Sequence, residues 1–473
     1  MHILGAYMEQ SFLLYYIQFL DGWIIVKRFF EKILDKIKKE ELLSRIIKAI
    51  GFGAGGAVIS KGLLMIFNII IARILTEQDY GAYSLINNTV QTFIVFAGAG
   101  IGVTLTRYVA LYRNKNKNIA GVIMGTLLLI NIIISLIVAL IVFIFSDKIA
   151  MLLNSDINIT NLLKITSATI FFTSVVSILQ GTLQGFEKYK RIAFIQVLSN
   201  ILNLIIGMLL ANFFGIIGAV ISLLVLQIIM FLVMQLTLNN VLKEEKIKLK
   251  CKFIEEIKKA ILKVTIPSFL ATIFVIPLMW FTNFFFSSRI GLEEFGAFSV
   301  CIQWFNIINY IPQQFGQLKP IYTQLYDNGE FKKLKKYLNK IILTAVCFSV
   351  ICTLLFILAR NVILLGYGKF YTQFGLPFSI MMIATVLFAI QSQYGSVFQA
   401  IGKSWICFIL NLVWAISYII MFFIFYSKGA IGYAYTYLIS YTIYAIISSM
   451  VFYNIIKSTN KCNINKCNNR KDD

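Results

Sequence analysis

Apolar stretches of roughly twenty residues alternate along almost the whole chain with short polar segments that are mostly basic. A helix of this length crosses a hydrocarbon core about 30 Å thick, and inside that core every backbone polar group needs a partner within its own segment. The pattern therefore predicts an all-α polytopic membrane protein. Twelve transmembrane helices are expected, near residues 52–75, 82–106, 119–145, 161–183, 192–213, 216–238, 262–286, 295–318, 341–360, 376–400, 405–427 and 430–456.

One loop-and-helix sequence occurs twice, at a fixed offset of 215 residues. Tyr80–Leu85 returns as Phe295–Val300 with its Gly, Ala and Ser unchanged, and Gln184 returns as Gln399. Self-similarity at a fixed period indicates a duplicated unit. Six spans per copy bring the chain back to its starting side, so both copies share one orientation, as in transporters built from parallel repeats. We expect two six-helix lobes around a central cavity.

The predicted spans divide the chain into five regions. Residues 1–50 are expected to form a basic amphipathic arm, 51–240 the N-lobe, 241–261 a cytoplasmic linker, 262–456 the C-lobe and 457–473 a disordered cytoplasmic tail. The arm places apolar residues at helical spacing against a Lys/Glu face, which is typical of a helix lying in the lipid headgroup region. A thirteenth span at the start of the arm is the alternative, and Asp21 at its centre counts against it.

The distribution of positive charge predicts the orientation. Most of the 43 Lys and Arg residues fall in the N-terminal region, the alternate loops and the C-terminal tail. Both termini are therefore expected in the cytoplasm. The membrane that the chain spans is expected to be the cytoplasmic (inner) membrane. The net charge of +22 then reflects topology and attraction to anionic lipid. With 59% hydrophobic residues, the chain leaves no soluble domain to bind nucleic acid, and we expect no such partner.

Cysteine and histidine give no sign of a metal site. The seven cysteines lie in predicted spans or cytoplasmic segments, where a structural disulfide is not expected. Cys462 and Cys467 lack two further ligands at finger spacing, and the one histidine is His2. We therefore expect no metal and no cofactor.

Amides inside the predicted spans match between the two copies. At the same offset Asn68 corresponds to Asn283, Asn88 to Gln303 and Gln91 to Asn306. One face of the span near 295–318 carries an amide row made of Gln303, Asn306, Gln313 and Gln317. Uncompensated amides are costly in hydrocarbon, so these side chains are predicted to line a cavity that offers hydrogen bonds to sugar hydroxyls. For any single amide, hydrogen bonding between helices is the alternative.

Cations without nearby acids are the second candidate chemistry. Lys61 lies about 15 Å along the first span, and Arg73 and Arg289 lie near the outer ends of the first and seventh spans. All 21 acidic residues fall outside the span cores, whereas a cation-coupled pump usually needs a buried carboxylate. This arrangement favours an anionic passenger such as a phosphate or pyrophosphate. The alternatives are that Lys61 snorkels to the headgroups and that the arginines anchor helix ends.

Three segments of the sequence resemble the polysaccharide flippases, also called O-antigen translocases. They are Arg73–Leu75 followed by Tyr80–Leu85, then Gly98–Gly102 leading to Thr106–Val109 and the basic loop to Lys117, and finally Leu183–Gly185 with Lys188–Arg191. The resemblance extends over about residues 51–456. It implies membership of the multidrug/oligosaccharidyl-lipid/polysaccharide exporter superfamily. It further implies alternating access between two lobes, a cationic central cavity, and movement of a polyprenyl-linked oligosaccharide to the outer leaflet. The N-terminal arm departs from the family pattern.

A lipid-linked oligosaccharide flippase for surface polysaccharide biosynthesis is therefore the expected function. Its partners would be that substrate, membrane lipids and glycan-assembly proteins, and it is expected to act as a monomer. A multidrug exporter of the same fold is the alternative, and the lack of intramembrane acids counts against it. A membrane enzyme is not expected, because no Asp-x-Asp metal site and no long outer loop with basic catalytic residues are evident.

Overall fold

The computed structural model describes residues 41–98, 100–151, 159–266, 269–270 and 275–468; within these ranges, the side chains of 41–55, 57, 263, 317, 320, 404 and 456–468 are not described. The chain divides into two units, residues 1–55 and 56–473. The predicted amphipathic arm lies almost wholly outside the described residues, since only its helical backbone from Glu41 onward is described.

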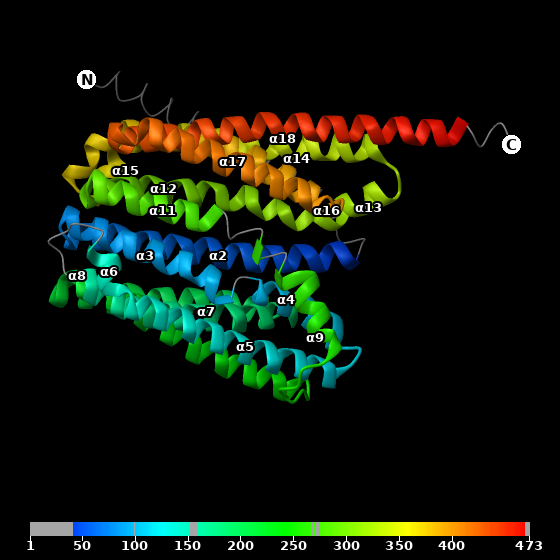
Figure 1. Cartoon of the computed structure of the whole chain (residues 1–473), viewed down its shortest axis with the longest axis horizontal. Helices are drawn as coiled ribbons and strands as arrows, with labels where there is room; N and C mark the ends of the chain where they lie inside the picture. Colours follow the sequence, from blue (N-terminus) through cyan, green and yellow to red (C-terminus); the bar gives the residue numbers. More distant parts are fainter. Residues whose placement is uncertain (1–40, 99, 152–158, 267–268, 271–274, 469–473) are drawn as a thin grey trace, which may run out of the picture. The chain divides into compact units, whose positions relative to one another are not determined.

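The N-terminal half consists of helices with local start signals in the sequence. They are α2 (Glu41–Ile74), α3 (Glu77–Gly98), α4 (Ile101–Tyr112), α5 (Lys117–Ile144), α6 (Ser146–Met151), α7 (Ile159–Gly185) and α8 (Tyr189–Glu244). Before α3, the Thr76 hydroxyl accepts a hydrogen bond from the Asp79 backbone N–H at 3.1 Å, and Asn116 caps α5 in the same way. In this half α7 packs against α3, α4, α5 and α8 (Figure 1).

A short linker leads to the C-terminal half. The linker contains α9 (Glu255–Ala260) and η1 (Ile261–Thr265). The C-terminal half contains α11 (Val275–Arg289), α12 (Leu292–Gln314), η2 (Phe315–Leu318), α13 (Lys319–Asp327), α14 (Phe331–Leu358), α15 (Arg360–Tyr367), η3 (Lys369–Phe374), α16 (Gly375–Ala400), α17 (Ser404–Phe425), η4 (Tyr426–Lys428) and α18 (Gly429–Asn468). Here α16 packs against α12, α14, α17 and α18, so it has the position that α7 has in the first half.

The described helices confirm the predicted all-α membrane fold. Within the described residues, six helices are long and apolar enough to cross a membrane, or seven if α3 and α4 together form one span. These two helices are bent by 51° around Gly98 and Gly100, where a single span over 82–106 was predicted. Gly100 has φ 95°, a value that ends a regular helix. The count of twelve spans stays a prediction.

Two of the six long segments fold back on themselves at a glycine. Gly215 in α8 has φ 58° and ψ −137°, and Gly429 between η4 and α18 has φ 67° and ψ −149°. Three residues beyond each lies a second glycine, Gly218 or Gly432, whose added Cβ would lie 1.9 Å from a carbonyl oxygen of the preceding arm. The same tight turn therefore occurs at corresponding places in both halves, as expected for a duplicated unit.

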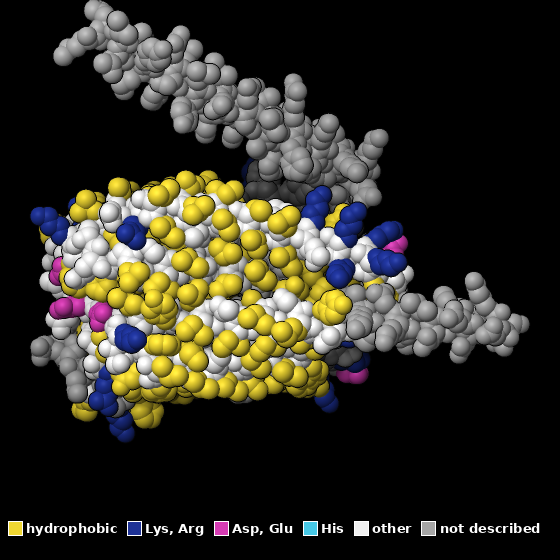
Figure 2. Space-filling view, turned by 90° about the horizontal axis from the view of Figure 1, so that it is seen from above, with side chains coloured by type: hydrophobic (Ala, Val, Ile, Leu, Met, Phe, Trp, Pro, Cys, Tyr) yellow, Lys and Arg dark blue, Asp and Glu magenta, His cyan; other side chains and the backbone are white. Residues whose placement is uncertain are grey.

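The surface of the described unit matches a membrane environment. Figure 2 shows hydrophobic side chains over the middle of the visible face, with charged side chains gathered toward its two ends. Large apolar side chains such as Leu136, Ile137, Leu355 and Leu358 are exposed by half or more. In water a patch of this extent would drive association, whereas in a bilayer it is the lipid-facing surface.

Replacing Gly215 by alanine is expected to lower the stability of the whole protein. A Cβ would meet nothing within 4 Å at this position, so the effect isolates backbone strain from crowding. A non-glycine residue in this conformation costs about 1–3 kcal/mol. The melting temperature in detergent should fall by a few degrees, while Gly395→Ala in α16, which also meets nothing within 4 Å and needs no positive φ, should leave it unchanged. Equal melting temperatures for both variants would contradict the assigned turn.

Candidate functional site between the two halves

The two halves meet most closely where α3 and α12 begin. A Cβ added to Gly81 would lie 1.8 Å from the Leu292 carbonyl oxygen, and one added to Gly296 would lie 3.0 Å from the Gly81 Cα. One turn further along, the Ser299 hydroxyl donates to the Ser84 hydroxyl at 2.9 Å. Gly81 and Gly296, like Ser84 and Ser299, are equivalent residues of the repeat. Contact between equivalent residues is expected beside a two-fold axis, so this axis runs between α3 and α12.

Polar contacts extend this closure, which we call the α3–α12 seal and define by Gly81, Ser84, Gly296 and Ser299. The Gln303 amide donates to the Tyr80 hydroxyl at 2.9 Å. Arg73, at the end of α2, donates through Nη2 to the Leu365 carbonyl oxygen of α15 at 2.8 Å and through Nε to the Gly366 carbonyl oxygen. A guanidinium that bonds the last carbonyls of a helix is a favourable C-terminal cap. Arg73 therefore links the halves.

The predicted cation Lys61, three turns before Arg73 on α2, lies against the other half of the protein. The Lys61 ammonium of α2 lies over the Tyr310 ring of α12, 5.0 Å from its centroid. Within the described residues, Lys61 forms no ion pair, and every carboxylate lies at a helix end or in a connecting segment. The Lys61 side chain is exposed, as are those of Gln91, Asn306 and Gln313. An uncompensated ammonium therefore faces the other half of the protein beside exposed amides.

The remaining predicted site residues are buried or lie elsewhere. Asn68 and Asn283 are buried, and Asn283 accepts a hydrogen bond from Tyr433. Asn88 is partly buried with its carbonyl oxygen unpaired among the described residues. Arg289 is exposed with its guanidinium 5.7 Å from the Phe285 ring, and the Gln317 side chain is outside the described set. The assignment of these residues as a binding site stays a prediction.

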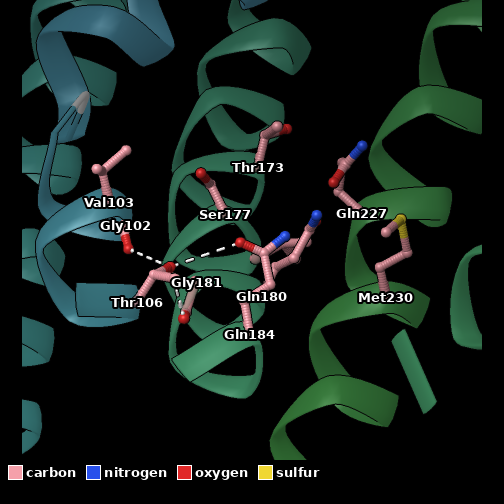
Figure 3. Close-up of a pocket in the computed structure, with 11 residues that line it drawn as sticks. Gly102, Val103, Thr106, Thr173, Ser177, Gln180, Gly181, Gln184, Gln227 and Met230 are labelled. Atoms are coloured by element: carbon pink, nitrogen blue, oxygen red, sulfur yellow. Dashed lines mark hydrogen bonds between the residues drawn. The ribbon is translucent and has the colours of Figure 1, made fainter. Parts of the chain in front are cut away.

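A polar pocket in the N-terminal half was not predicted. It has a volume of about 330 Å³ and lies between α4, α7 and α8 (Figure 3). It is lined by Gly102, Val103, Thr106, Thr173, Val176, Ser177, Gln180, Gly181, Gln184, Gln227 and Met230. Thr106 donates to the Gly181 carbonyl oxygen at 2.9 Å and lies 3.5 Å from the Gln184 amide oxygen. Hydroxyl and amide groups without a charge suit a neutral, hydroxyl-bearing ligand.

A chain of amides leads from the neighbourhood of Lys61 to this pocket. The residue before Lys61, Ser60, accepts a hydrogen bond from Asn200 of α8. One turn earlier on α8, Gln196 donates to Gln180 of α7 at 3.3 Å. The signal was present in the sequence, because Gln180 and Gln184, like Gln196 and Asn200, are four residues apart and so share a helical face. The predicted site was based instead on the amides that match between the two copies, and these lie in other spans.

The corresponding end of the C-terminal half carries a lysine that was also missed. Lys319, the first residue of α13, donates to the Gln399 amide oxygen at 2.7 Å. Gln399 is the repeat equivalent of Gln184. Burial lowers the pKa of the Lys319 ammonium. The sequence placed Lys319 just beyond the predicted span 295–318, where a lysine is ordinarily taken to mark the cytoplasmic end of a span.

Comparison by sequence identifies one family. A family model described as "Polysaccharide biosynthesis protein" matches residues 46–317, which is more than half of the chain. The matched range includes α3, the α3–α12 seal, Lys61 and the polar pocket. Among curated proteins no match was found.

Solved structures with the same fold are transporters of the MOP superfamily. An inward-facing multidrug resistance MATE family transporter is 17% identical, with a TM-score of 0.70 over 85% of this chain and 96% of that chain. An outward-facing multidrug resistance MATE family transporter is 18% identical, with a TM-score of 0.66 over 88% of this chain and 96% of that chain. A MOP superfamily transporter from Pyrococcus furiosus Vc1 (DSM3638), whose reverse binding-pocket polarity suggests a different function, is 17% identical, with a TM-score of 0.66 over 88% and 97%. This chain therefore has the fold of these transporters.

Proposed function

We propose that this chain, which belongs to the polysaccharide biosynthesis protein family, flips a polyprenyl phosphate- or pyrophosphate-linked oligosaccharide from the inner to the outer leaflet. The main support for this proposal is the position of Lys61. Its ammonium faces Tyr310 of the other half without forming an ion pair among the described residues. An unpaired ammonium within a membrane protein is costly, and a phosphate group that enters between the halves would supply its partner.

Exposed polar groups of α3 and α12 suit the remaining parts of such a substrate. Gln91, Asn306 and Gln313 are exposed and offer donors and acceptors to sugar hydroxyls, and the Tyr310 ring offers a face to a sugar ring. The neutral pocket beyond the amide chain has room for part of the glycan. The prenyl tail would stay in the bilayer, because its transfer into a polar site would forfeit hydrophobic stabilisation.

Transport would proceed by alternating access. The proposed orientation has the protein in the inner membrane with both termini in the cytoplasm. In that orientation the α3–α12 seal closes the site toward the outside. Opening would separate Ser84 from Ser299 and release Arg73 from α15, while the opposite ends of the halves approach each other. No covalent step is involved, so the protein would act without catalysis and without a cofactor. It would act as a monomer in the membrane. Glycan-assembly proteins on either side would supply and consume the lipid-linked glycan.

Reconstituted vesicles test this function directly. A fluorescent polyprenyl-pyrophosphate oligosaccharide is placed in both leaflets, and a membrane-impermeant quencher reports how much of it becomes accessible over time. Vesicles containing the protein should expose label that protein-free vesicles keep inaccessible. If the two preparations behave alike at matched protein content, with the fold verified by circular dichroism, the flippase proposal is wrong.

Multidrug export is the second candidate, since two of the solved transporters of this fold are described as multidrug resistance proteins. Cells expressing the protein should then tolerate higher concentrations of cationic drugs than cells carrying the empty vector. The flippase proposal predicts no such difference, because Lys61 would repel a cationic drug. A several-fold rise in tolerated concentration that persists in Lys61→Ala cells would favour drug export.

Replacing Gln227 in the polar pocket is expected to weaken substrate binding moderately. A neutral hydrogen bond contributes roughly 0.5–1.5 kcal/mol, so Gln227→Ala should raise the KM for the labelled glycolipid by about 2- to 10-fold with little change in the maximal rate. Gln235→Ala is the matched control, since Gln235 lies two turns further along α8 and donates to Asn239 outside the pocket. An unchanged KM for Gln227→Ala would exclude the pocket from the substrate path.

A further inference from the structure

The segment that follows α8 is held against the first two turns of α5. This segment, residues 247–254, is not helical, and we call it the lysine strap after Lys248, Lys250 and Lys252. The Lys250 backbone N–H donates to the Gly121 carbonyl oxygen at 3.2 Å. The Thr126 hydroxyl donates to the Lys252 carbonyl oxygen and accepts from the Lys252 backbone N–H, each at 3.1 Å. The backbone of the strap is therefore bound to a rigid helix at several points.

Glycines of α5 make this close approach possible. A Cβ on Gly121 would lie 2.2 Å from the Lys248 carbonyl oxygen, and one on Gly125 would lie 2.5 Å from the Lys250 carbonyl oxygen. Real Cβ atoms do not approach oxygen so closely, so any larger residue would lift the strap away. The two glycines are four residues apart and form one face of α5. The strap fits this face along its length.

Side chains along the strap alternate between basic and apolar. Lys248, Lys250 and Lys252 are all exposed, and within the part of the chain that the structure describes none of them forms an ion pair. Between and beyond them, Leu249 is 40% exposed and Phe253 65% exposed. Three unpaired ammonium groups beside exposed apolar side chains form a surface suited to the boundary between lipid headgroups and acyl chains.

The position of the strap along α5 puts it at that boundary. Residues 120–127 of α5 are buried, because the strap and neighbouring helices cover them, whereas one face of α5 is open from Leu129 onward, with Ile133 and Leu136 each 50% exposed. The helix rises 1.5 Å per residue, so Gly121 lies about 12 Å from the first exposed leucine. The lysines thus stand one to two turns beyond the lipid-facing apolar surface, at the depth of the headgroup phosphates.

We propose that the lysine strap is a docking surface for anionic phospholipids of the leaflet on its side of the membrane. The lysines bind the headgroup phosphates, and Leu249 and Phe253 enter the outer part of the acyl region. Of the four acids that flank the strap, Glu244 binds Arg191 and Glu255 binds Lys259, each at 2.9 Å. Glu245 and Glu256 form no ion pair with the strap lysines among the described residues. The strap also begins the connection between the two halves, so bound lipid would hold that connection in place. This inference does not depend on which substrate is transported.

Lipid binding by the full-length protein in detergent tests the proposal. The melting temperature is measured during titration with short-chain phosphatidylglycerol, with phosphatidylcholine and with inorganic phosphate. We expect phosphatidylglycerol alone to raise the melting temperature, and the shift should decline with added salt. If phosphatidylcholine gives an equal shift, the surface does not recognise charge. If inorganic phosphate gives it, the site binds free anions and the lipid proposal is overturned.

Two sets of variants assign the effect to the strap. Each Lys near an anionic surface contributes roughly five-fold, so Lys248→Gln/Lys250→Gln/Lys252→Gln should weaken the apparent phosphatidylglycerol affinity about a hundred-fold. The matched triple Lys332→Gln/Lys336→Gln/Lys340→Gln removes the same charge from exposed positions of α14 and should change the affinity far less. Gly121→Ala keeps every lysine but lifts the strap, and it should also weaken binding. Equal losses in the two lysine triples, or full affinity in the strap triple, would overturn the proposal.

Discussion

Replacing Lys61 by alanine is expected to reduce flipping of the lipid-linked oligosaccharide by roughly 10- to 150-fold at limiting substrate. This range corresponds to the loss of one charge-assisted hydrogen bond of about 1.5–3 kcal/mol to a phosphate oxygen. Lys61→Glu should be more severe, because it adds repulsion between two anions. Lys61→Arg should retain most of the activity, since a guanidinium also binds phosphate well.

A lysine at the surface provides the control for this prediction. Lys148 in α6 is exposed and lies over the Phe145 ring, 5.5 Å from its centroid. Lys148→Glu makes the same change in charge without altering the space between the halves, and flipping should be unaffected. The measurement is the initial rate in reconstituted vesicles at matched protein content. If Lys61→Glu flips the substrate as fast as the wild type, the ammonium does not bind the passenger.

Replacing Gly81 by alanine is expected to prevent the α3–α12 seal from forming as the structure has it. The new Cβ would lie 1.8 Å from the Leu292 carbonyl oxygen, which belongs to backbone and cannot rotate away. Overpacking of this kind costs about 1–3 kcal/mol, and every 1.4 kcal/mol shifts an equilibrium between closed and open states tenfold. The closed state should therefore become about ten times less populated, or more, and flipping should fall with it.

Two other glycine variants make the prediction quantitative. Gly296→Ala should have a smaller effect, because its Cβ would lie 3.0 Å from the Gly81 Cα and a slight shift of the helices relieves that contact. Gly395→Ala should have none, since its Cβ meets nothing within 4 Å. Gly81→Ala should slow flipping most, Gly296→Ala less and Gly395→Ala not at all. Labelling of the seal by a membrane-impermeant reagent should increase in the same order, with the largest increase for Gly81→Ala. A seal variant with wild-type flipping and labelling would contradict the assigned closure.

The repeated sequence predicted much of the fold because equivalent residues in the two copies form equivalent helices and pack in equivalent places. The offset that matches Tyr80–Leu85 with Phe295–Val300 placed α3 and α12 in equivalent positions, and the structure brings Ser84 and Ser299 into direct contact. It could not show that these equivalent residues touch each other, because contact depends on how the two halves dock. The break between α3 and α4 was missed because Gly98 and Gly100 lie within a continuous apolar run.

The candidate site was harder to predict because an amide looks the same in the sequence wherever it points. The Lys61 ammonium lies over the Tyr310 ring of α12, whereas Asn283 is 1% exposed and bonded to Tyr433, and Arg73 binds backbone carbonyls of α15. The polar pocket was missed because its amides come from different spans, and their convergence at Gln180 is a property of packing. Residue type and helical spacing indicate that an amide row exists, and only the tertiary structure shows which rows face a cavity.

Flipping by the Ser84→Cys/Ser299→Cys variant, with the native cysteines replaced by alanine, tests whether the two halves separate at the seal during transport. The two hydroxyl oxygens lie 2.9 Å apart, so the introduced thiols are placed to form a disulfide across the axis between the halves. We predict that the reduced protein moves the labelled polyprenyl-pyrophosphate oligosaccharide, that the oxidised protein does not, and that reduction restores movement. Undiminished flipping by the cross-linked protein would contradict it, because the two halves would then transport without separating at the seal.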